Sequence, residues 1–494
     1  MKELYIKYKS LVVGSFILVV SALLYIANPL QLAFEANITL CFAFVMISTW
    51  ISEIIPMPVT SLLPLLLFPL FGISTLQAVS VSYSDPVIFL FMGGFFLAIA
   101  IEKWNLHTRI ALHVINFCGH HPSRVLLGFM LSTYLISMWI SNTATTMMMY
   151  PIALSIIHVL SENNKPEQIK KFSIAILLCI AYASNIGGLA TIIGTPPNSA
   201  FIAFVKDQYQ IQIGFLKWMI ICVPISLTLL ILLFLTFNFV LFPSKLENSE
   251  KGKSFLKEKI KLLGSWTSGE KRVMIIFLCM ALLWIFKDFI NQFTSLKLTD
   301  TFVALLGTFL LFIFPSGNNQ NVQEYEIDET NIRTKRLLNW GDTSKMSWGI
   351  LIMFGGGLAL AKQLENCGLL NSLGSNLSGY VSSNLFLTIL LVTTITIFLS
   401  EVMSNIAQVI VFSPIICSIS VSMGLSPLVL GIPMCLAASC ASMLPMGTPP
   451  NAIVYGSGQI PLRNMLKAGW VLNFISIITI TVFCYTFAVL LKII

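Results

Sequence analysis

Residues 194–198 read Gly-Thr-Pro-Pro-Asn, and the same five residues recur at 447–451. Each run lies inside a long apolar stretch, 172–205 or 426–460. Proline has no backbone N–H, and it pushes the residue before it out of the α-helical region. Both stretches are therefore predicted to be broken helices, in which backbone carbonyls upstream of the prolines lack partners within the helix.

The similarity extends to the residues before each run. A shift of 263 residues superimposes several distinctive residues: Gly93-Gly94 on Gly356-Gly357, Glu102 on Glu365, Ser137 on Ser400, Ser141-Asn142 on Ser404-Asn405, and Pro151 on Pro414. A gap of ten residues then brings the two Gly-Thr-Pro-Pro-Asn runs, 253 residues apart, into register. Such agreement predicts an internal repeat. The predicted organisation is an N-terminal helix within 1–35, a first repeat at 36–242, a cytoplasmic linker at 243–270 and a second repeat at 271–494.

The composition places both repeats in a membrane. Of 494 residues, 56% are hydrophobic and only 10% are charged, whereas soluble domains carry about 25% charged residues. This balance excludes a soluble enzyme, a disordered protein and a nucleic-acid-binding protein. The apolar segments are continuous and do not alternate with polar residues, which argues against a transmembrane β-barrel. The expected fold class is an all-α polytopic membrane protein.

The apolar segments define the predicted crossings, because a membrane-spanning helix needs about 20 apolar residues. Eleven segments are predicted to cross the membrane: 11–27, 37–55, 59–73, 87–106, 172–205, 217–242, 271–292, 301–314, 348–365, 426–460 and 468–492. Two others, 125–160 and 383–420, are too long for one crossing and have polar residues at their centres. They are predicted to be re-entrant hairpins with tips at 141–143 and 404–406.

The basic residues orient this layout. With the N-terminus inside, all but six of the 29 Lys and Arg residues fall on the inside; the exceptions are Lys206, Lys217, Lys287, Lys297, Lys362 and Lys492. Cytoplasmic loops carry such an excess of Lys and Arg, so the N-terminus is predicted to be cytoplasmic and the C-terminus outside. Five predicted crossings separate the two hairpins, which makes the repeats inverted, an arrangement typical of secondary transporters.

The hairpin tips and broken helices supply candidate substrate ligands. Polar groups are costly in a membrane unless they are satisfied, and a helix N-terminus at each tip suits a carboxylate or another oxyanion. The alternative is that these residues only cap the hairpin helices. The predicted substrate-binding residues are Ser141, Asn142, Thr143, Thr195, Pro196, Ser404, Asn405, Ile406, Thr448 and Pro449.

The free carbonyls and neighbouring side-chain oxygens are candidate ligands for a cation such as Na⁺. One site is predicted from Ser137, Ser141, Asn142 and Gly194. A second is predicted from Ser400, Asn405, Gly447 and Thr448. The alternative is that the paired prolines only kink each helix.

Charged residues are scarce around these sites. None occurs at 125–161 or 172–205, and Glu401 is the only one at 366–462. A bound anion therefore has no fixed cationic partner, so bound cations are expected to offset its charge, which favours cation–anion cotransport. Glu401 is predicted to orient neighbouring groups without contacting the substrate. Catalytic and phosphate-binding motifs such as GxSxG, HExxH and the P-loop do not occur, so neither an enzyme nor a cofactor is expected.

The four motifs and their order resemble the divalent anion:sodium symporters, which carry dicarboxylates, citrate or sulfate. The segments GGFFLAIAIEKWNLHTRIAL and FGGGLALA also look like that family. The resemblance implies a homodimer in the plasma membrane, with a scaffold domain and a transport domain that moves like an elevator. It implies Na⁺ as the coupling ion and a small divalent anion as the substrate.

One departure from the family pattern is Ile406, because many members have a hydroxyl residue there. The leading hypothesis is a Na⁺-coupled importer of C4-dicarboxylates such as succinate. The alternatives are a sulfate or tricarboxylate symporter and a dicarboxylate exchanger. More remote alternatives are an anion channel, which would use the same donors, and a membrane-embedded enzyme, which would need a catalytic set.

Overall fold

The structure, a computed structural model, describes residues 2–29, 31–119, 121–161, 164–243, 250–295, 297–317, 336–370 and 384–489. Within these ranges the chain is helical, and the only β pairing is an isolated bridge between Pro315 and Arg336. Eight of the described helices are long and apolar enough to cross a membrane, and five shorter helices are also apolar. The prediction of a polytopic all-α membrane protein is confirmed.

The N-terminal region begins with two long helices, α1 (Lys2–Ala27) and α2 (Phe34–Ser52), which pack together. The predicted crossing at 59–73 is not one continuous helix. It is divided between α3 (Met57–Thr60) and α4 (Leu63–Leu70), because Pro64 starts a new helix in a first-turn position where its missing N–H costs nothing. Two short elements follow, α5 (Leu76–Val81) and η1 (Ser82–Ser84).

The first set of helices surrounds the first Gly-Thr-Pro-Pro-Asn run. It consists of α6 (Pro86–Lys103), α7 (Leu106–Cys118), α8 (Pro122–Ser137), α9 (Asn142–Ser161), α10 (Pro166–Leu189), α11 (Pro196–Tyr209) and α12 (Phe215–Leu235), which continues as the π-helix η2 (Thr236–Leu241). The predicted hairpin at 125–160 corresponds to α8 and α9, which are joined by a short turn at 138–141.

The second set surrounds the second run. It consists of α14 (Ser268–Phe293), α15 (Asp300–Ile313), η3 (Trp340–Lys345), α16 (Trp348–Asn366), α18 (Leu385–Ser400), α19 (Asn405–Ser422), α20 (Pro427–Ala437), α21 (Pro449–Gly456) and α22 (Leu462–Val489). The linker that joins the two sets contains α13 (Glu250–Leu262). The predicted crossing at 468–492 corresponds to α22, and its last three residues lie outside the described ranges. Helices α18 and α19 form the second hairpin.

The second half-helix begins at the first proline of each run, as predicted, whereas the helix before it ends well upstream of the prolines. Helix α10 ends at Leu189 and α11 begins at Pro196, while α20 ends at Ala437 and α21 begins at Pro449. The residues of α10 from Phe172 onward are all buried, so this helix lies at the centre of the molecule.

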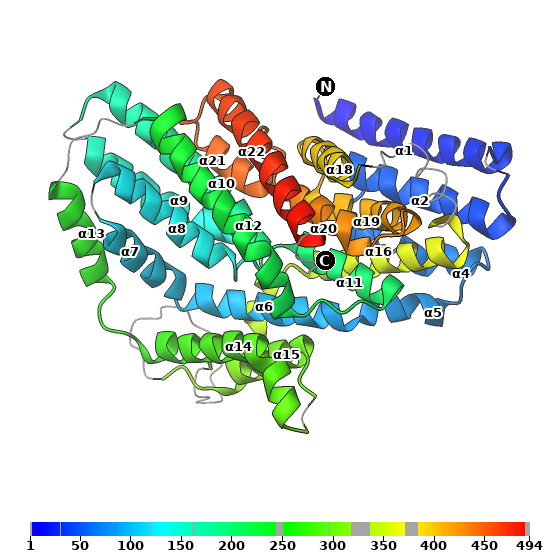
Figure 1. The fold of residues 1–494 in the computed structure, drawn as a ribbon, viewed down its shortest axis with the longest axis horizontal. Helices are drawn as coiled ribbons and strands as arrows, with labels where there is room; N and C mark the ends of the chain where they lie inside the picture. Colours follow the sequence, from blue (N-terminus) through cyan, green and yellow to red (C-terminus); the bar gives the residue numbers. More distant parts are fainter. Residues whose placement is uncertain are drawn as a thin grey trace.

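The two hairpins lie on opposite sides of the molecule, with the broken helices between them (Figure 1). The half-helix that follows each break packs on elements from the other set. Helix α11 contacts α19 and α20, whereas α21 contacts α9 and α10. The two sets of helices are therefore interlocked at the centre.

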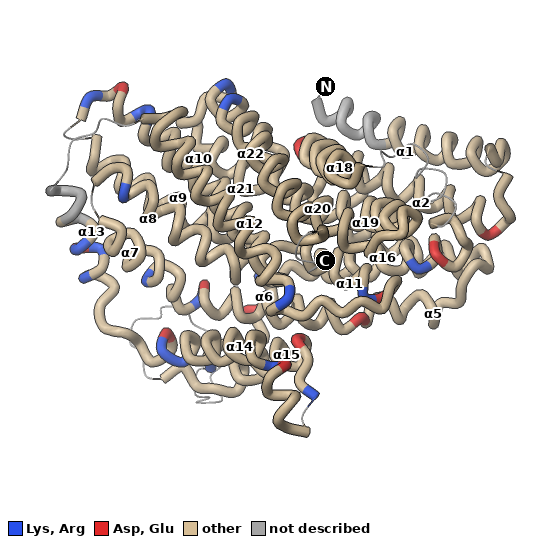
Figure 2. Tube along the Cα trace, viewed as in Figure 1, with Lys and Arg blue, Asp and Glu red and all other residues tan. Residues whose placement is uncertain are grey.

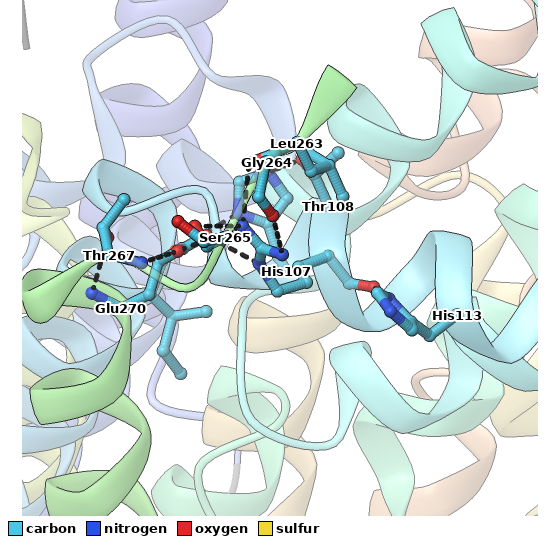
Figure 3. A network of polar contacts seen from close by, with 10 residues as sticks. His107, Thr108, His113, Leu263, Gly264, Ser265, Thr267 and Glu270 are labelled. Atoms are coloured by element: carbon cyan, nitrogen blue, oxygen red, sulfur yellow. Dashed lines mark hydrogen bonds and ion pairs between the residues drawn. The ribbon is translucent and has the colours of Figure 1, made fainter. Parts of the chain in front are cut away.

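Charged residues lie mainly at helix ends and in connections, and long stretches of the helices carry none (Figure 2). A buried ion pair fastens the linker between the two sets. The guanidinium of Arg109 on α7 donates to both carboxylate oxygens of Glu270 on α14, at 2.9 and 3.2 Å. It also donates to the carbonyl oxygens of Leu263 and Gly264, which follow α13 (Figure 3). Arg109 therefore fixes the junction of α13 and α14 against α7.

Candidate functional site

The first hairpin tip contains a compact group of oxygen atoms. Ser137 Oγ, at the end of α8, lies 2.9 Å from Asn142 Oδ1 at the start of α9. The same Oγ lies 2.7 Å from the carbonyl oxygen of Ser184 on α10. The predicted ligands Ser137 and Asn142 are thus brought into direct contact, and the Ser184 carbonyl joins them.

The second tip repeats this geometry. Ser400 Oγ lies 2.8 Å from Asn405 Oδ1 and 2.5 Å from the carbonyl oxygen of Ala438. Ser400 ends α18, Asn405 begins α19, and Ala438 follows α20. The two oxygen groups therefore have the same composition: a serine hydroxyl, an asparagine amide oxygen and a backbone carbonyl.

In each oxygen group one serine hydroxyl proton faces two acceptors. The amide oxygen and the carbonyl only accept, so the hydroxyl cannot satisfy both fully. Hard cations such as Na⁺ prefer neutral and anionic oxygen ligands, and transporters coordinate them with unwound backbone and side-chain oxygens at helix breaks. Either group can therefore hold a small cation.

Glycines allow the broken helices to approach the tips. A Cβ atom added to Gly188 would lie 2.3 Å from Asn142 Oδ1, and one added to Gly194 would lie 2.6 Å from the Gly188 carbonyl oxygen. At the second tip, a Cβ atom on Gly447 would lie 2.8 Å from Glu401 Oε2. The predicted ligand Gly447 thus lies beside Glu401 at the second tip, whereas the predicted ligand Gly194 lies against Gly188, which in turn lies against Asn142 at the first tip.

The asparagines of the two runs donate hydrogen bonds to some of the backbone carbonyls in the irregular segment of each broken helix. Asn198 Nδ2 donates to the carbonyl oxygens of Gly188, at 3.0 Å, and Thr191, at 2.8 Å. Asn451 Nδ2 donates to the carbonyl oxygens of Ala441 and Leu444, at 3.3 and 3.2 Å. Several carbonyls that were expected to be free for a cation are therefore occupied by these amides, which hold the irregular segments in shape.

Glu401 is buried beside the second tip and accepts four hydrogen bonds. Its Oε1 accepts from the backbone N–H groups of Ser442 and Met443 and from Asn473 Nδ2, and its Oε2 accepts from the N–H of Leu444. These contacts have lengths of 2.8–2.9 Å. The carboxylate therefore ties the tip of the hairpin to the irregular segment after α20.

The surroundings of the two tips differ. Trp139 beside the first tip packs against Phe215 and Trp284, with ring centroids 5.9 and 6.3 Å away, and those two rings stack on each other at 4.7 Å. At the second tip, Val402 is 65% exposed. The first tip is thus anchored against α14, whereas the second tip is open on this side.

The remaining predicted residues make few polar contacts. Ser141 Oγ caps α9 by accepting from the N–H of Ala144 at 3.3 Å, as the capping alternative predicts. The side chains of Thr143, Thr195 and Ser404 make no hydrogen bond within the described part of the chain. Pro196 and Pro449 begin their half-helices, and Ile406 is half-buried against the apolar core.

A polar contact near the first tip joins the first set of helices to the second Gly-Thr-Pro-Pro-Asn run. Asn185 on α10 donates from Nδ2 to Thr448 Oγ1 at 3.0 Å, and its Oδ1 accepts from Asn142 Nδ2 at 3.4 Å. Asn185 was not among the predicted ligands. The signal that could have found it is the pair of polar residues Ser184-Asn185 in an otherwise apolar helix.

Comparisons with known proteins identify relatives over nearly the whole chain. Residues 7–494 match the family described as the sodium:sulfate symporter transmembrane region. The sodium-dependent dicarboxylate transporter SdcS of Staphylococcus saprophyticus is 40% identical over 486 residues, which cover 96% of this chain and 90% of that protein. The SdcS protein of Staphylococcus aureus strain USA300 has the same identity and coverage.

Two solved transporter structures share the fold at low sequence identity. The YdaH transporter of Alcanivorax borkumensis superimposes with a TM-score of 0.54 at 10% identity, covering 83% of this chain and 87% of that one. MtrF of Neisseria gonorrhoeae, described as one of a class of antimetabolite efflux pumps, gives a TM-score of 0.51 at 10% identity, covering 92% and 95%.

Proposed function

Because the chain belongs to the sodium:sulfate symporter family, we propose that it imports a C4-dicarboxylate such as succinate together with Na⁺. The observation that carries this proposal is the pair of matching oxygen groups at Ser137–Asn142 and Ser400–Asn405, each with fewer protons than acceptors. The name of the SdcS relatives, sodium-dependent dicarboxylate transporters, supports the choice of ion and substrate.

In this proposal the substrate binds between the two tips. Thr143 and Thr448 donate hydroxyl protons to its carboxylates, and the helix N-termini at Asn142 and Asn405 add backbone donors. The cations lie next to the anion, so that each ligand lowers the electrostatic cost of the other. The remaining predicted residues, Ser141, Thr195, Pro196, Ser404, Ile406 and Pro449, line the same space.

The proposed transport cycle moves the hairpins and broken helices across the membrane relative to a scaffold, within a homodimer. The predicted inverted repeats at 36–242 and 271–494 support alternating access. In such transporters the two repeats are related by a pseudo-two-fold axis in the membrane plane, and the inward-open and outward-open states interconvert as one part moves against the other. The identical 263-residue offset of α8 and α18 is consistent with such repeats. The excess of Lys and Arg on one side supports a plasma-membrane orientation with a cytoplasmic N-terminus and an outside C-terminus.

Uptake into proteoliposomes tests the proposal. We expect labelled succinate to accumulate only with an inward Na⁺ gradient, and citrate and sulfate to compete more weakly. An uptake rate that is unchanged by Na⁺ but is increased by dicarboxylate inside the vesicles would identify an exchanger. Flux that does not saturate and cannot concentrate succinate would identify a channel.

Transport is expected to carry net positive charge inward. The anion has no Lys or Arg partner at 125–161, 172–205 or 366–462, so cations must offset its charge. If more cations than anionic charges enter per cycle, net positive charge moves inward. An inside-negative potential then assists by about 2.3 kcal/mol per charge per 100 mV. A potassium–valinomycin potential should accelerate uptake, and an unchanged rate would show electroneutral coupling.

Ile406→Thr is expected to favour succinate over citrate and sulfate. Ile406 corresponds to Thr143 under the 263-residue shift, and a threonine there adds a donor for the second carboxylate. A charge-assisted hydrogen bond contributes roughly 1.5–3 kcal/mol. If the new hydroxyl realises part of this energy, the apparent succinate affinity should rise several-fold.

The measurement is the set of inhibition constants of the three anions, with Ile410→Thr on the same helix as a control for the general effect of a hydroxyl. Ile406 packs partly against the core, so a purely structural role predicts a lower melting temperature with unchanged ratios of the three constants. That result would remove Ile406 from the substrate site.

A further inference from the structure

We propose that Asn185 is a positioning residue that couples cation binding at the first tip to the anion donor Thr448 in the second loop. This inference rests on the proposed function and assigns a role to a residue of α10 outside both predicted ligand sets. Its basis is a continuous series of direct hydrogen bonds from Ser137 through Asn142 and Asn185 to Thr448.

The series begins at the first oxygen group. A cation there would bind Asn142 Oδ1, since that atom shares one hydroxyl proton with Ser137 and the Ser184 carbonyl. Coordination of an amide oxygen withdraws electrons from the amide and makes its N–H groups stronger donors. The Asn142 Nδ2 group points to Asn185 Oδ1, 3.4 Å away, so the cation strengthens that bond.

The series ends by fixing the proton of Thr448. Asn185 accepts through Oδ1, and its Nδ2 therefore donates to Thr448 Oγ1 at 3.0 Å. Thr448 Oγ1 also accepts from the backbone N–H of Asn451 at 3.4 Å. Both lone pairs of the hydroxyl are thus engaged, and its own proton is left to donate to an anion. Hydrogen bonds in such a chain polarise one another.

The opposite half of the molecule lacks this bridge. Because the Ser184 and Ala438 carbonyls occupy equivalent positions, Ser439 is the counterpart of Asn185. Ser439 is buried, and its Oγ has no hydrogen-bond partner in the part of the chain that the structure describes. The side chain of Thr195, the counterpart of Thr448, also makes no hydrogen bond there. The coupling is therefore one-sided and runs from the first cation site to the second loop.

Tyr182 provides a matched control on the same face of α10. Its Oη donates to the carbonyl oxygen of Ser442 at 2.8 Å, so it also holds the second loop. The described residues show no bond from Tyr182 to the first tip. Tyr182→Phe removes one hydrogen bond between α10 and this loop, as Asn185→Ser does, but it leaves the series from Asn142 to Thr448 intact.

The test measures succinate binding to the purified full-length protein at low and at saturating Na⁺, with a fluorescence-based thermal shift as the stability readout. The key quantity is the succinate dissociation constant at low Na⁺ divided by that at saturating Na⁺, which measures how strongly Na⁺ promotes succinate binding. We expect Asn185→Ser to reduce this ratio at least about fivefold, the lower end of typical coupling between sites. Tyr182→Phe should lower the melting temperature but keep the wild-type ratio.

A second variant, Asn185→Thr, keeps more of the buried volume and should also lose the coupling, because its hydroxyl is too short to span from Asn142 to Thr448. In both Asn185 variants Na⁺ alone should raise the melting temperature by as much as in the wild type, as expected if both cation sites are intact. An unchanged ratio in both variants would overturn the inference, as would an equal loss in Tyr182→Phe. If the wild type itself shows no Na⁺ effect on succinate binding, the proposed function fails and the inference fails with it.

Discussion

Asn142→Ala and Asn405→Ala should each abolish transport while leaving the protein folded. Each asparagine supplies the amide oxygen of one oxygen group, and each begins the second helix of a hairpin. Each variant loses the amide oxygen that contacts the cation, and a charge-assisted contact of roughly 1.5–3 kcal/mol corresponds to about a 10- to 150-fold loss of cation affinity. The measurement is Na⁺-driven succinate uptake at equal reconstituted protein.

Asn37→Ala is the control for this pair of substitutions. Asn37 is a buried asparagine on α2 that donates to the carbonyl oxygen of Tyr25, and no described contact links it to either tip. It should lose stability comparably but keep Na⁺-dependent uptake. Near-normal uptake by either tip variant would contradict the assignment of that tip to the transport site.

Glu401→Ala should destabilise the protein more than any other single substitution considered for the second tip. It leaves three backbone N–H groups and the Asn473 amide without their acceptor in a buried region. Each orphaned buried donor costs about 1–3 kcal/mol, so the free energy of unfolding should fall by at least about 4 kcal/mol. The measurement is thermal or denaturant unfolding in detergent.

Glu401→Gln separates hydrogen bonding from the loss of the whole side chain. Its amide oxygen can replace Oε1, but its NH₂ group would face the N–H of Leu444, so an intermediate loss is expected. Glu365→Ala removes a carboxylate at the exposed end of α16 and should change stability by about 0.5 kcal/mol or less. Equal stability of Glu401→Ala and Glu365→Ala would show that the carboxylate does not hold the segment after α20.

The sequence predicts the starts of the second half-helices and the hairpin tips well because their causes are local. The prolines of 194–198 and 447–451 begin α11 and α21 through their own geometry, and both half-helices start at the first proline of the run. Two polar residues in the middle of an apolar stretch likewise mark a turn, and α9 and α19 begin at those residues, Asn142 and Asn405.

The remaining features depend on contacts between distant segments. Every residue has a carbonyl, so nothing in the sequence distinguishes those of Ser184 and Ala438, which complete the oxygen groups. The role of Glu401 depends on backbone donors about 40 residues later in the chain, whose N–H groups become available only because α20 ends early. The partner of Asn185 lies in the other half of the molecule.

The exchange of half-helices between the two sets has a consequence for biosynthesis. Helix α11 leaves the ribosome long before α19 and α20, on which it packs, and α21 emerges long after α9 and α10. The first half of the nascent chain can therefore insert all its segments and still lack the neighbours that cover α11. The centre of the protein can form only after α21 has been synthesised, so premature termination anywhere before it should yield a membrane-inserted chain that quality-control proteases recognise as incomplete.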